Sequence, residues 1–110
     1  MNIHNRSTLI SFYRKHADYK DNLEKWFHDV SSAKYRKPSD VVKDFNSART
    51  IRNNRAIFGI NNNDYRMIVE FNFEKGWVFI KFLGTHAQYD KIAPETIDLF
   101  KPAKNKYTKK

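Results

Sequence analysis

The chain has 110 residues, 40% of them hydrophobic, no cysteine and a formal net charge of +9. This length fits one domain, the absence of cysteine excludes disulfides and thiolate metal sites, and no apolar run approaches the ~18 residues that a membrane span needs. We therefore expect a soluble cytoplasmic protein with one domain over residues 1–100 and a basic tail over residues 101–110. The charge favours a polyanionic partner, nucleic acid before membrane, although a basic surface kept for solubility also fits.

Apolar residues fall at helical spacing from Asn5 to about Tyr35 and predict two amphipathic helices. The two apolar stripes are Leu9, Phe12, Tyr13 and His16, and Leu23, Trp26, Phe27 and Val30. A short polar turn near Asp18–Lys20 predicts that the two helices are antiparallel neighbours. Asp21, with Glu24 three residues on, predicts a capping box at the start of the second helix. Pro38 suits the first turn of a further short helix over Pro38–Phe45.

The residues after Ser47 have the composition of strands. Three segments are rich in β-branched and aromatic residues, and polar turn sequences at 61–64 and 74–76 separate them. They are Arg55–Ile60, Tyr65–Phe73 and Trp77–Leu83. This order predicts an antiparallel meander, with further strands around Thr50–Arg52 and at residues 1–4. The fold class we expect is α+β, with two N-terminal helices packed on a small antiparallel sheet.

The central strand alternates, which predicts two different faces. Five apolar or aromatic residues would face the helices: Tyr65, Met67, Val69, Phe71 and Phe73. The residues between them would face a groove or water: Arg66, Ile68, Glu70 and Asn72. If residue 60 lies opposite 65 and residue 70 opposite 81, the core receives Ala56, Phe58, Ile60, Val78, Ile80 and Phe82. The open face then gathers Arg55, Arg66, Glu70 and Lys81, with His86 beside Arg66.

The segment that follows the last strand matches a capping box, with Thr85 as N-cap and Gln88 at the third helical position. A short C-terminal helix is expected here, with His86 and Tyr89 about one turn apart. The backbone N–H groups of that turn would favour an anion. With Arg66 and Lys81 nearby, the site is suited to a phosphate.

Cleavage of RNA without a metal needs a base for the 2′-OH, cations for the charge on phosphorus-bound oxygens, and an acid for the departing 5′-oxygen. Imidazole exchanges protons near neutral pH, so His86 can be the acid or the base. Tyr89 can take the other role, and the residues do not decide between them. Arg66 suits bidentate phosphate contact, and Lys81 or Lys91 can add positive charge.

Each residue also has an ordinary structural explanation. A lone histidine at a helix start is commonly a surface residue, Tyr89 a half-buried aromatic, and Arg55 or Arg66 with Glu70 a cross-strand ion pair. The four histidines share no ligand spacing, so no metal is expected. From the residues alone we expect a protein that binds RNA or phosphate. Three functions stay open: a nuclease, a non-catalytic RNA- or ribosome-binding module, and a protein-interaction subunit.

Motifs along residues 3–92 resemble the HigB toxin family, in order and at the right spacing. The most specific block is Gly84-Thr85-His86-Ala87-x-Tyr89-Asp90-Lys91-Ile92, and the supporting motifs are Trp26-Phe27-x-x-Val30-x-x-Ala33-x-Tyr35-x-x-Pro38, Asn54-Arg55-x-Ile57-Phe58-x-Ile60, Tyr65-Arg66-x-Ile68-Val69 and Val78-Phe79-Ile80-x-Phe82. The resemblance implies a RelE-like fold and an mRNA interferase that acts on the ribosome, without a cofactor. It also implies a helix-turn-helix antitoxin of HigA type as partner.

Carried over by motif, the resemblance implies that Arg66, His86 and Tyr89 are catalytic. It implies supporting or RNA-contacting roles for Arg55, Lys81, Asp90 and Lys91. Two positions depart from the family pattern: Gly59 stands where Asn is common, and Gln88 where Glu is common. Gln88 still closes a capping box, whereas Gly59, placed opposite Arg66, would widen the substrate groove.

Overall fold

The computed structural model describes residues 1–60 and 64–98, apart from the side chains of Thr8, Tyr13 and Asp18. In chain order the elements are β1 (Asn2–His4), α1 (Arg6–Lys15), the 3₁₀ helix η1 (Ala17–Tyr19), α2 (Lys20–Ser32), α3 (Pro38–Asp44), β2 (Arg49–Ile51), β3 (Arg55–Ile60), β4 (Tyr65–Asn72), β5 (Trp77–Thr85) and α4 (His86–Tyr89). The predicted tail over residues 101–110 and residues 61–63 of the predicted turn lie outside the described residues. No helix in the described part of the chain has the length and apolar character to span a membrane.

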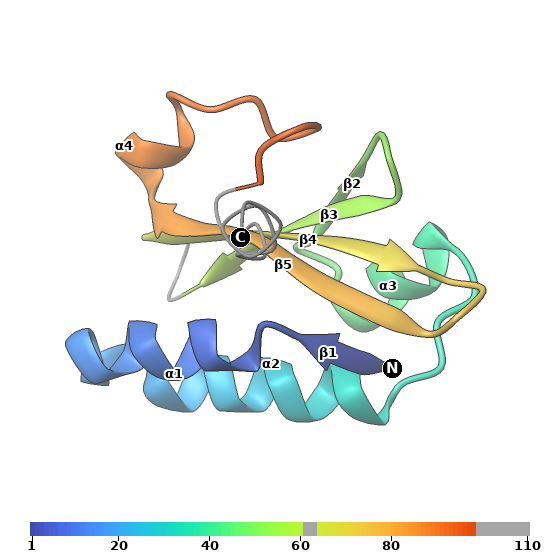
Figure 1. Ribbon diagram of the computed structural model, residues 1–110, viewed down its shortest axis with the longest axis horizontal. Helices are drawn as coiled ribbons and strands as arrows, with labels where there is room; N and C mark the ends of the chain where they lie inside the picture. Colours follow the sequence, from blue (N-terminus) through green and yellow to red (C-terminus); the bar gives the residue numbers. More distant parts are fainter. Residues whose placement is uncertain (61–63, 99–110) are drawn as a thin grey trace, which may run out of the picture.

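The strands form one five-stranded sheet in the order β1-β5-β4-β3-β2 (Figure 1). Four of the strands form the predicted antiparallel meander. The expectation of a wholly antiparallel sheet is wrong at one edge, because β1 pairs with β5 in parallel. β1 leads into α1 instead of a hairpin, so its direction is not set by a tight turn.

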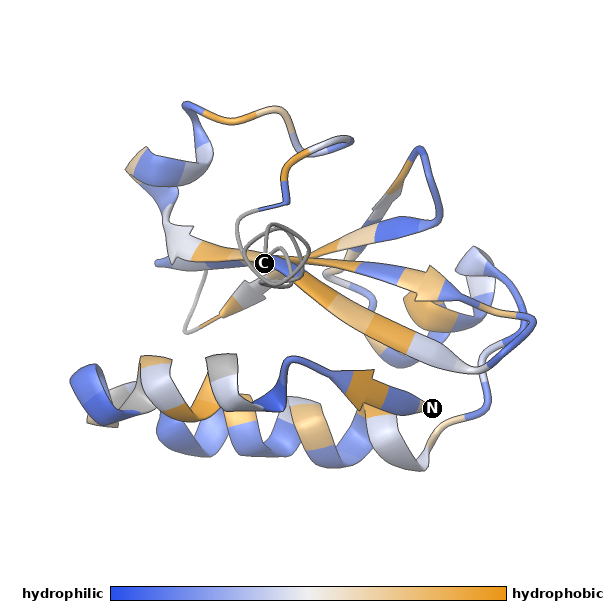
Figure 2. Ribbon diagram, in the orientation of Figure 1, coloured by the Kyte–Doolittle hydropathy of each residue, from blue (hydrophilic) through white to orange (hydrophobic). Residues whose placement is uncertain are grey.

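The helices α1 and α2 lie side by side on one face of the sheet, as Figure 1 shows. Their buried residues Leu9, Leu23, Trp26 and Val30 join the main core, and Figure 2 shows hydrophobic residues along the central strands that they cover. The two predicted N-terminal helices are therefore present, with η1 between them. The third predicted helix is also confirmed: α3 starts at Pro38 and ends one residue before the predicted Phe45.

The predicted start of the second helix is wrong. The N-cap of α2 is Tyr19 instead of Asp21, and no side chain caps the helix. The reason is η1, which runs directly into α2: the backbone N–H of Tyr19 donates to His16 O, and that of Lys20 donates to Ala17 O. Because the preceding turn supplies these acceptors, a side-chain cap is not required. Asp21 lies in the first turn of α2, where its negative charge suits the helix dipole.

The β3–β4 register is the predicted one, with Ile60 opposite Tyr65 and Arg55 opposite Glu70. The β4–β5 register differs from the prediction. Arg66 lies opposite Gly84, one residue from the predicted partner, and Glu70 lies opposite Phe79, two residues from it, because a bulge between Ile68 and Val69 adds one further step. Its extra residue is Lys81, which has no partner in β4, since Ile68 pairs with Phe82 and Val69 with Ile80.

The bulge changes which face β5 presents. Val78 and Ile80 are buried in the main core as predicted, but Phe82 belongs to a second cluster and Leu83 takes its place in the main core. A bulge leaves two consecutive residues on the same side of a strand, so the alternation restarts after Lys81. The prediction that Phe82 packs under the helices is therefore wrong.

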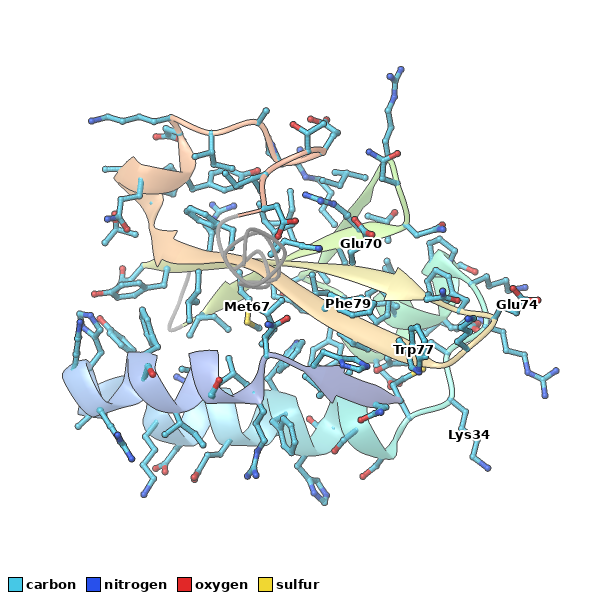
Figure 3. All side chains as sticks on the ribbon, viewed as in Figure 1. Lys34, Met67, Glu70, Glu74, Trp77 and Phe79 are labelled. Carbon is cyan, nitrogen blue, oxygen red and sulfur yellow. The ribbon has the colours of Figure 1, made fainter. Side chains whose placement is uncertain are left out.

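The second cluster lies on the sheet face opposite α1 and α2. Ile57, Ile68 and Phe82 form its buried part, and Ile51, Tyr89, Ile92 and Ile97 pack against it. The face predicted to be open at Ile68 is thus covered there by α4 and the chain that follows. Figure 3 shows Met67 and Glu70 of β4 on opposite sides of the sheet, Met67 toward the helices.

Candidate active site

The short helix α4 begins at the predicted capping box. The hydroxyl of Thr85 accepts from the Gln88 backbone N–H at 3.1 Å, and the Gln88 side chain accepts from the Thr85 backbone N–H at 2.9 Å. The N–H of His86 donates to Asp64 O at 3.2 Å. Since these donors of the first turn already have acceptors, the expectation that they would be free for an anion is wrong for His86 and Gln88.

Gly84 allows this turn to sit close to the strand. A Cβ atom at residue 84 would lie 2.6 Å from Oε1 of Gln88 and 2.9 Å from Cζ of Phe82, both too close for unbonded atoms. A side chain at this position would therefore push Gln88 out of the capping box. The two functional candidates of α4 are His86 and Tyr89, which follow this glycine by two and five residues.

His86 lies at the surface of α4, with more than half of its side chain exposed. Its Nδ1 atom is 3.2 Å from Oδ2 of Asp90, one helical turn further on, and the two form an ion pair when the imidazole is protonated. The centroids of the His86 and Tyr89 rings are 6.3 Å apart. An exposed imidazole held by a carboxylate can exchange protons with a bound substrate.

Tyr89 lies between the second hydrophobic cluster and two arginines. Its ring centroid is 6.4 Å from that of Phe82 and 5.3 Å from Cζ of Arg66. Its hydroxyl oxygen accepts from Nη2 of Arg49 at 3.1 Å. Because Arg49 uses a lone pair of that oxygen, the phenolic proton stays available for donation to another group.

Arg66 reaches Tyr89 from the neighbouring strand β4. Its Nε atom is buried and has no hydrogen-bond partner among the described residues. No ion pair in the described part of the chain uses its guanidinium, which distinguishes it from Arg55 on the same face. A guanidinium without a carboxylate partner is free to bind an incoming phosphate.

The arginine that sequence reasoning missed is Arg49. It lies on β2 opposite Ile57, so its side chain shares the face of the sheet with Arg66 and Ile68. The sequence feature that could have located Arg49 is the pair Asn53-Asn54. Both residues adopt positive φ angles, 65° and 57°, in the tight β2–β3 turn. Asn tolerates this conformation, so the pair predicts a hairpin whose register places Arg49.

The structure places Arg55 and Lys81 under the chain that follows α4. The guanidinium of Arg55 is 6% exposed and donates to Glu70 Oε1 at 2.8 Å, Pro94 O at 2.9 Å and Ile97 O at 2.7 Å. Nζ of Lys81 lies 3.4 Å from Oδ1 of Asp98. Both cations are thus committed to holding this segment on the sheet.

The predicted residues therefore divide into two groups. Arg66, His86, Tyr89 and Asp90 come together around α4, joined by Arg49. Lys91 is exposed at the end of α4, whereas Arg55 and Lys81 lie beneath the following segment. Within residues 1–60 and 64–98, no three His, Asp or Glu side chains lie close enough to hold a metal ion.

Comparisons with known proteins identify the family. A search of curated proteins returned no match. The family model of the HigB toxin, described as the RelE-like toxic component of a toxin–antitoxin system, matches residues 19–92. This match covers more than half of the chain, including β2 to β5 and all of α4. The chain belongs to the HigB toxin family of toxin–antitoxin systems.

Proposed function

We propose that this toxin is a metal-independent endoribonuclease that cleaves mRNA on the ribosome and so stops translation. The observation that carries the proposal is the cluster at α4: the guanidinium of Arg66, which has no carboxylate partner among the described residues, lies over Tyr89, while His86 is exposed one helical turn away. These are a cation and two proton-transfer groups, which are what cleavage of a phosphodiester requires.

In the proposed reaction a base removes the proton of a 2′-OH, whose oxygen attacks the adjacent phosphorus. The bond from phosphorus to the 5′-oxygen breaks, and an acid protonates that oxygen, which leaves a 2′,3′-cyclic phosphate and a 5′-OH. Arg66 stabilises the charge on the non-bridging oxygens. His86 and Tyr89 share the roles of base and acid, with Asp90 orienting the imidazole and Arg49 the phenol.

We assign Lys91 to contact with the RNA, since it is exposed beside the cluster. Arg55 and Lys81 act as supporting residues that fix the segment after α4. The domain proposed for this activity is residues 1–100, with residues 101–110 as a basic tail. The partner that neutralises the toxin is a helix-turn-helix antitoxin of HigA type, and the site of action is the cytoplasm.

The test is a primer-extension map of cleavage on mRNA translated in a reconstituted system. We expect wild-type toxin to produce cuts only when ribosomes are present, and His86→Ala and Arg66→Ala each to reduce the cleavage rate by about 10²–10³-fold. His28→Ala and Arg36→Ala, which alter exposed residues away from α4, are the matched controls.

Two results would contradict the proposal. If both active-site variants cleave at the wild-type rate, the catalytic assignment fails. If wild-type toxin binds ribosomes or RNA in a salt-sensitive way but never cuts, the protein is a non-catalytic binding module on the same scaffold.

A further inference from the structure

A groove lies between α2, the chain that follows α3 and the outer edge of β3. Its volume is about 640 Å³, and its lining includes Trp26 of α2, Phe45 and Ser47 after α3, and Phe58 and Gly59 of β3. The Phe58 ring meets those of Trp26 and Phe45 edge-on, at centroid distances of 5.6 Å and 5.1 Å. None of the candidate catalytic residues lines this groove.

β3 has a free edge beside the groove. β2 pairs only with Arg55–Ile57, so in the described part of the chain Phe58–Ile60 has a neighbouring strand on the β4 side alone. Asn54 O accepts from Phe71 N on that side, and successive residues of an antiparallel strand direct their backbone groups to alternate sides. The N–H and C=O of Gly59 therefore point away from β4, toward the groove. Such an edge can pair with an added strand.

Trp26 lines the groove and carries a buried polar atom without a partner in the described part of the chain. The residue is 3% exposed, and its indole Nε1 is buried with no hydrogen-bond partner among the described residues. A buried donor without an acceptor destabilises the free protein. A carbonyl of a partner in the groove would remove this penalty if the indole turned on binding, because Nε1 is buried in the free protein.

The charges that line the groove favour a polypeptide over RNA. One lysine and two aspartates line it, so its formal charge is −1 on a chain of net charge +9. Lys25 and Asp29 neutralise each other at 2.7 Å, which leaves Asp44, whose Oδ2 accepts from Tyr35 OH. Among the described residues that line the groove the one cation is Lys25, which is already paired, so the groove suits a polyanion poorly, whereas a peptide backbone finds matching donors and acceptors.

We propose that this groove binds an extended segment of the antitoxin. The segment adds a short strand along Phe58–Ile60, places a carbonyl on the indole N–H of Trp26, and brings a basic side chain to Asp44. Gly59 of β3 lies opposite Arg66 in the sheet, so the added strand would come nearest to the candidate active site at Gly59. The inference rests on the antitoxin that the family implies and is independent of RNA cleavage.

The experiment follows the indole N–H signals of ¹⁵N-labelled full-length toxin by NMR. The chain has two tryptophans, and Trp77→Phe identifies which signal belongs to Trp26. The probe is the antitoxin, identified as the protein whose gene restores growth to cells that express the toxin. We expect the Trp26 signal to shift and its hydrogen exchange to slow, while the Trp77 signal stays in place.

Affinities of variants complete the test. Trp26→Phe keeps an aromatic ring but removes the donor, so it should weaken antitoxin binding by about fivefold to tenfold. Ser47→Arg should weaken it further by filling the groove, and Trp77→Phe should leave it unchanged. An unmoved Trp26 signal at saturating antitoxin overturns the proposal, and the only variant that this step needs is Trp77→Phe, which lies away from the groove. A shift produced instead by an RNA oligonucleotide, or by raising the toxin concentration alone, also overturns it.

Discussion

The guanidinium carbon of Arg66 lies 5.3 Å from the centroid of the Tyr89 ring, which joins β4 to α4 through a cation–π contact. Arg49 reaches the same tyrosine from β2 and donates to its hydroxyl oxygen. Tyr89 thus has a cation at its face and another at its hydroxyl. The ring positions Arg66 and the hydroxyl is available for proton transfer, so these two contributions can be separated by mutation.

Tyr89→Phe should abolish most of the cleavage and leave the fold intact. The variant keeps the ring under Arg66 and removes only the hydroxyl, so the loss of one proton-transfer group should slow cleavage by about 10²–10⁴-fold. The free energy of unfolding should fall by about 1 kcal/mol or less, because one exposed hydrogen bond is lost. Single-turnover cleavage and urea denaturation measure the two effects. Wild-type cleavage by this variant would show that Tyr89 acts only as a support for Arg66.

Arg49→Ala should lower the cleavage rate by at least about tenfold, since it removes the donor to the Tyr89 hydroxyl and one cation near the phosphate. The matched control is Arg52→Ala, which removes an exposed arginine from the adjacent turn. Cleavage rates measured on translated mRNA compare the two. Equal losses in both variants would mean that only the overall charge matters.

Gly84→Ala should inactivate the toxin without touching a catalytic side chain. The added methyl group would meet Gln88 and Phe82, so the capping box should open and His86 and Tyr89 should move. Overpacking of this kind costs about 1–3 kcal/mol of unfolding free energy. A crystal structure or the amide exchange of α4, measured beside the cleavage rate, tests this. A native α4 with full activity would show that the neighbours yield at no cost.

Arg55→Met should lower the free energy of unfolding, although Arg55 donates to none of the candidate catalytic residues. It keeps an apolar side chain but leaves Glu70 and the carbonyls of Pro94 and Ile97 without their donor. Because Arg55 is buried but Glu70 is partly exposed, leaving these acceptors without their donor should cost about 1–3 kcal/mol. Urea denaturation should show this loss, and Arg52→Ala should not. A loss below about 1 kcal/mol would mean that the segment after α4 is held mainly by its isoleucines.

The stability of α3 should depend on acid pH through Asp40. The backbone N–H of Arg36 donates to Asp40 Oδ2 at 2.9 Å and holds the pKa of that carboxyl below its ordinary value. A lowered folded-state pKa means that the stabilisation is complete above the unfolded-state pKa and is lost as the pH falls through the folded-state pKa. Asp40→Asn keeps the acceptor and removes the charge, so it should be less stable than wild type at pH 7 and equal to it in strong acid. A stability difference that does not change with pH would contradict this.

Much of the fold follows from local pattern. The turn sequence predicted the β3–β4 register, because a turn closed at residues 61–64 places Ile60 opposite Tyr65 and puts Ala56, Phe58 and Ile60 on the core face, as observed. The bulge at Lys81 was not predictable in this way. Phe82 and Leu83 are both hydrophobic, so the sequence does not show which of them faces the main core. That choice is made by the second cluster, whose other members come from distant parts of the chain.

The site was predictable to a similar extent. The Thr85–Gln88 capping box is local, and it correctly placed His86 and Tyr89 on one short helix. The burial of Arg55 was not visible, because it depends on carbonyl groups some forty residues away, at Pro94 and Ile97. Arg49 was missed because the strand expected at Thr50–Arg52 left it out, and a three-residue strand has too short a pattern to fix its face without the hairpin at Asn53-Asn54.

The bulge in β5 determines which face of the sheet each residue after Lys81 occupies. If β5 continued through Lys81 without the bulge, Phe82 would turn toward α1 and α2, Leu83 toward the second cluster, and Gly84 away from the face that carries Arg66. The chain would then leave the strand rotated by half a turn, and α4 would start on the wrong side of the sheet. The bulge thus decides on which side of the sheet α4 and the candidate active site lie.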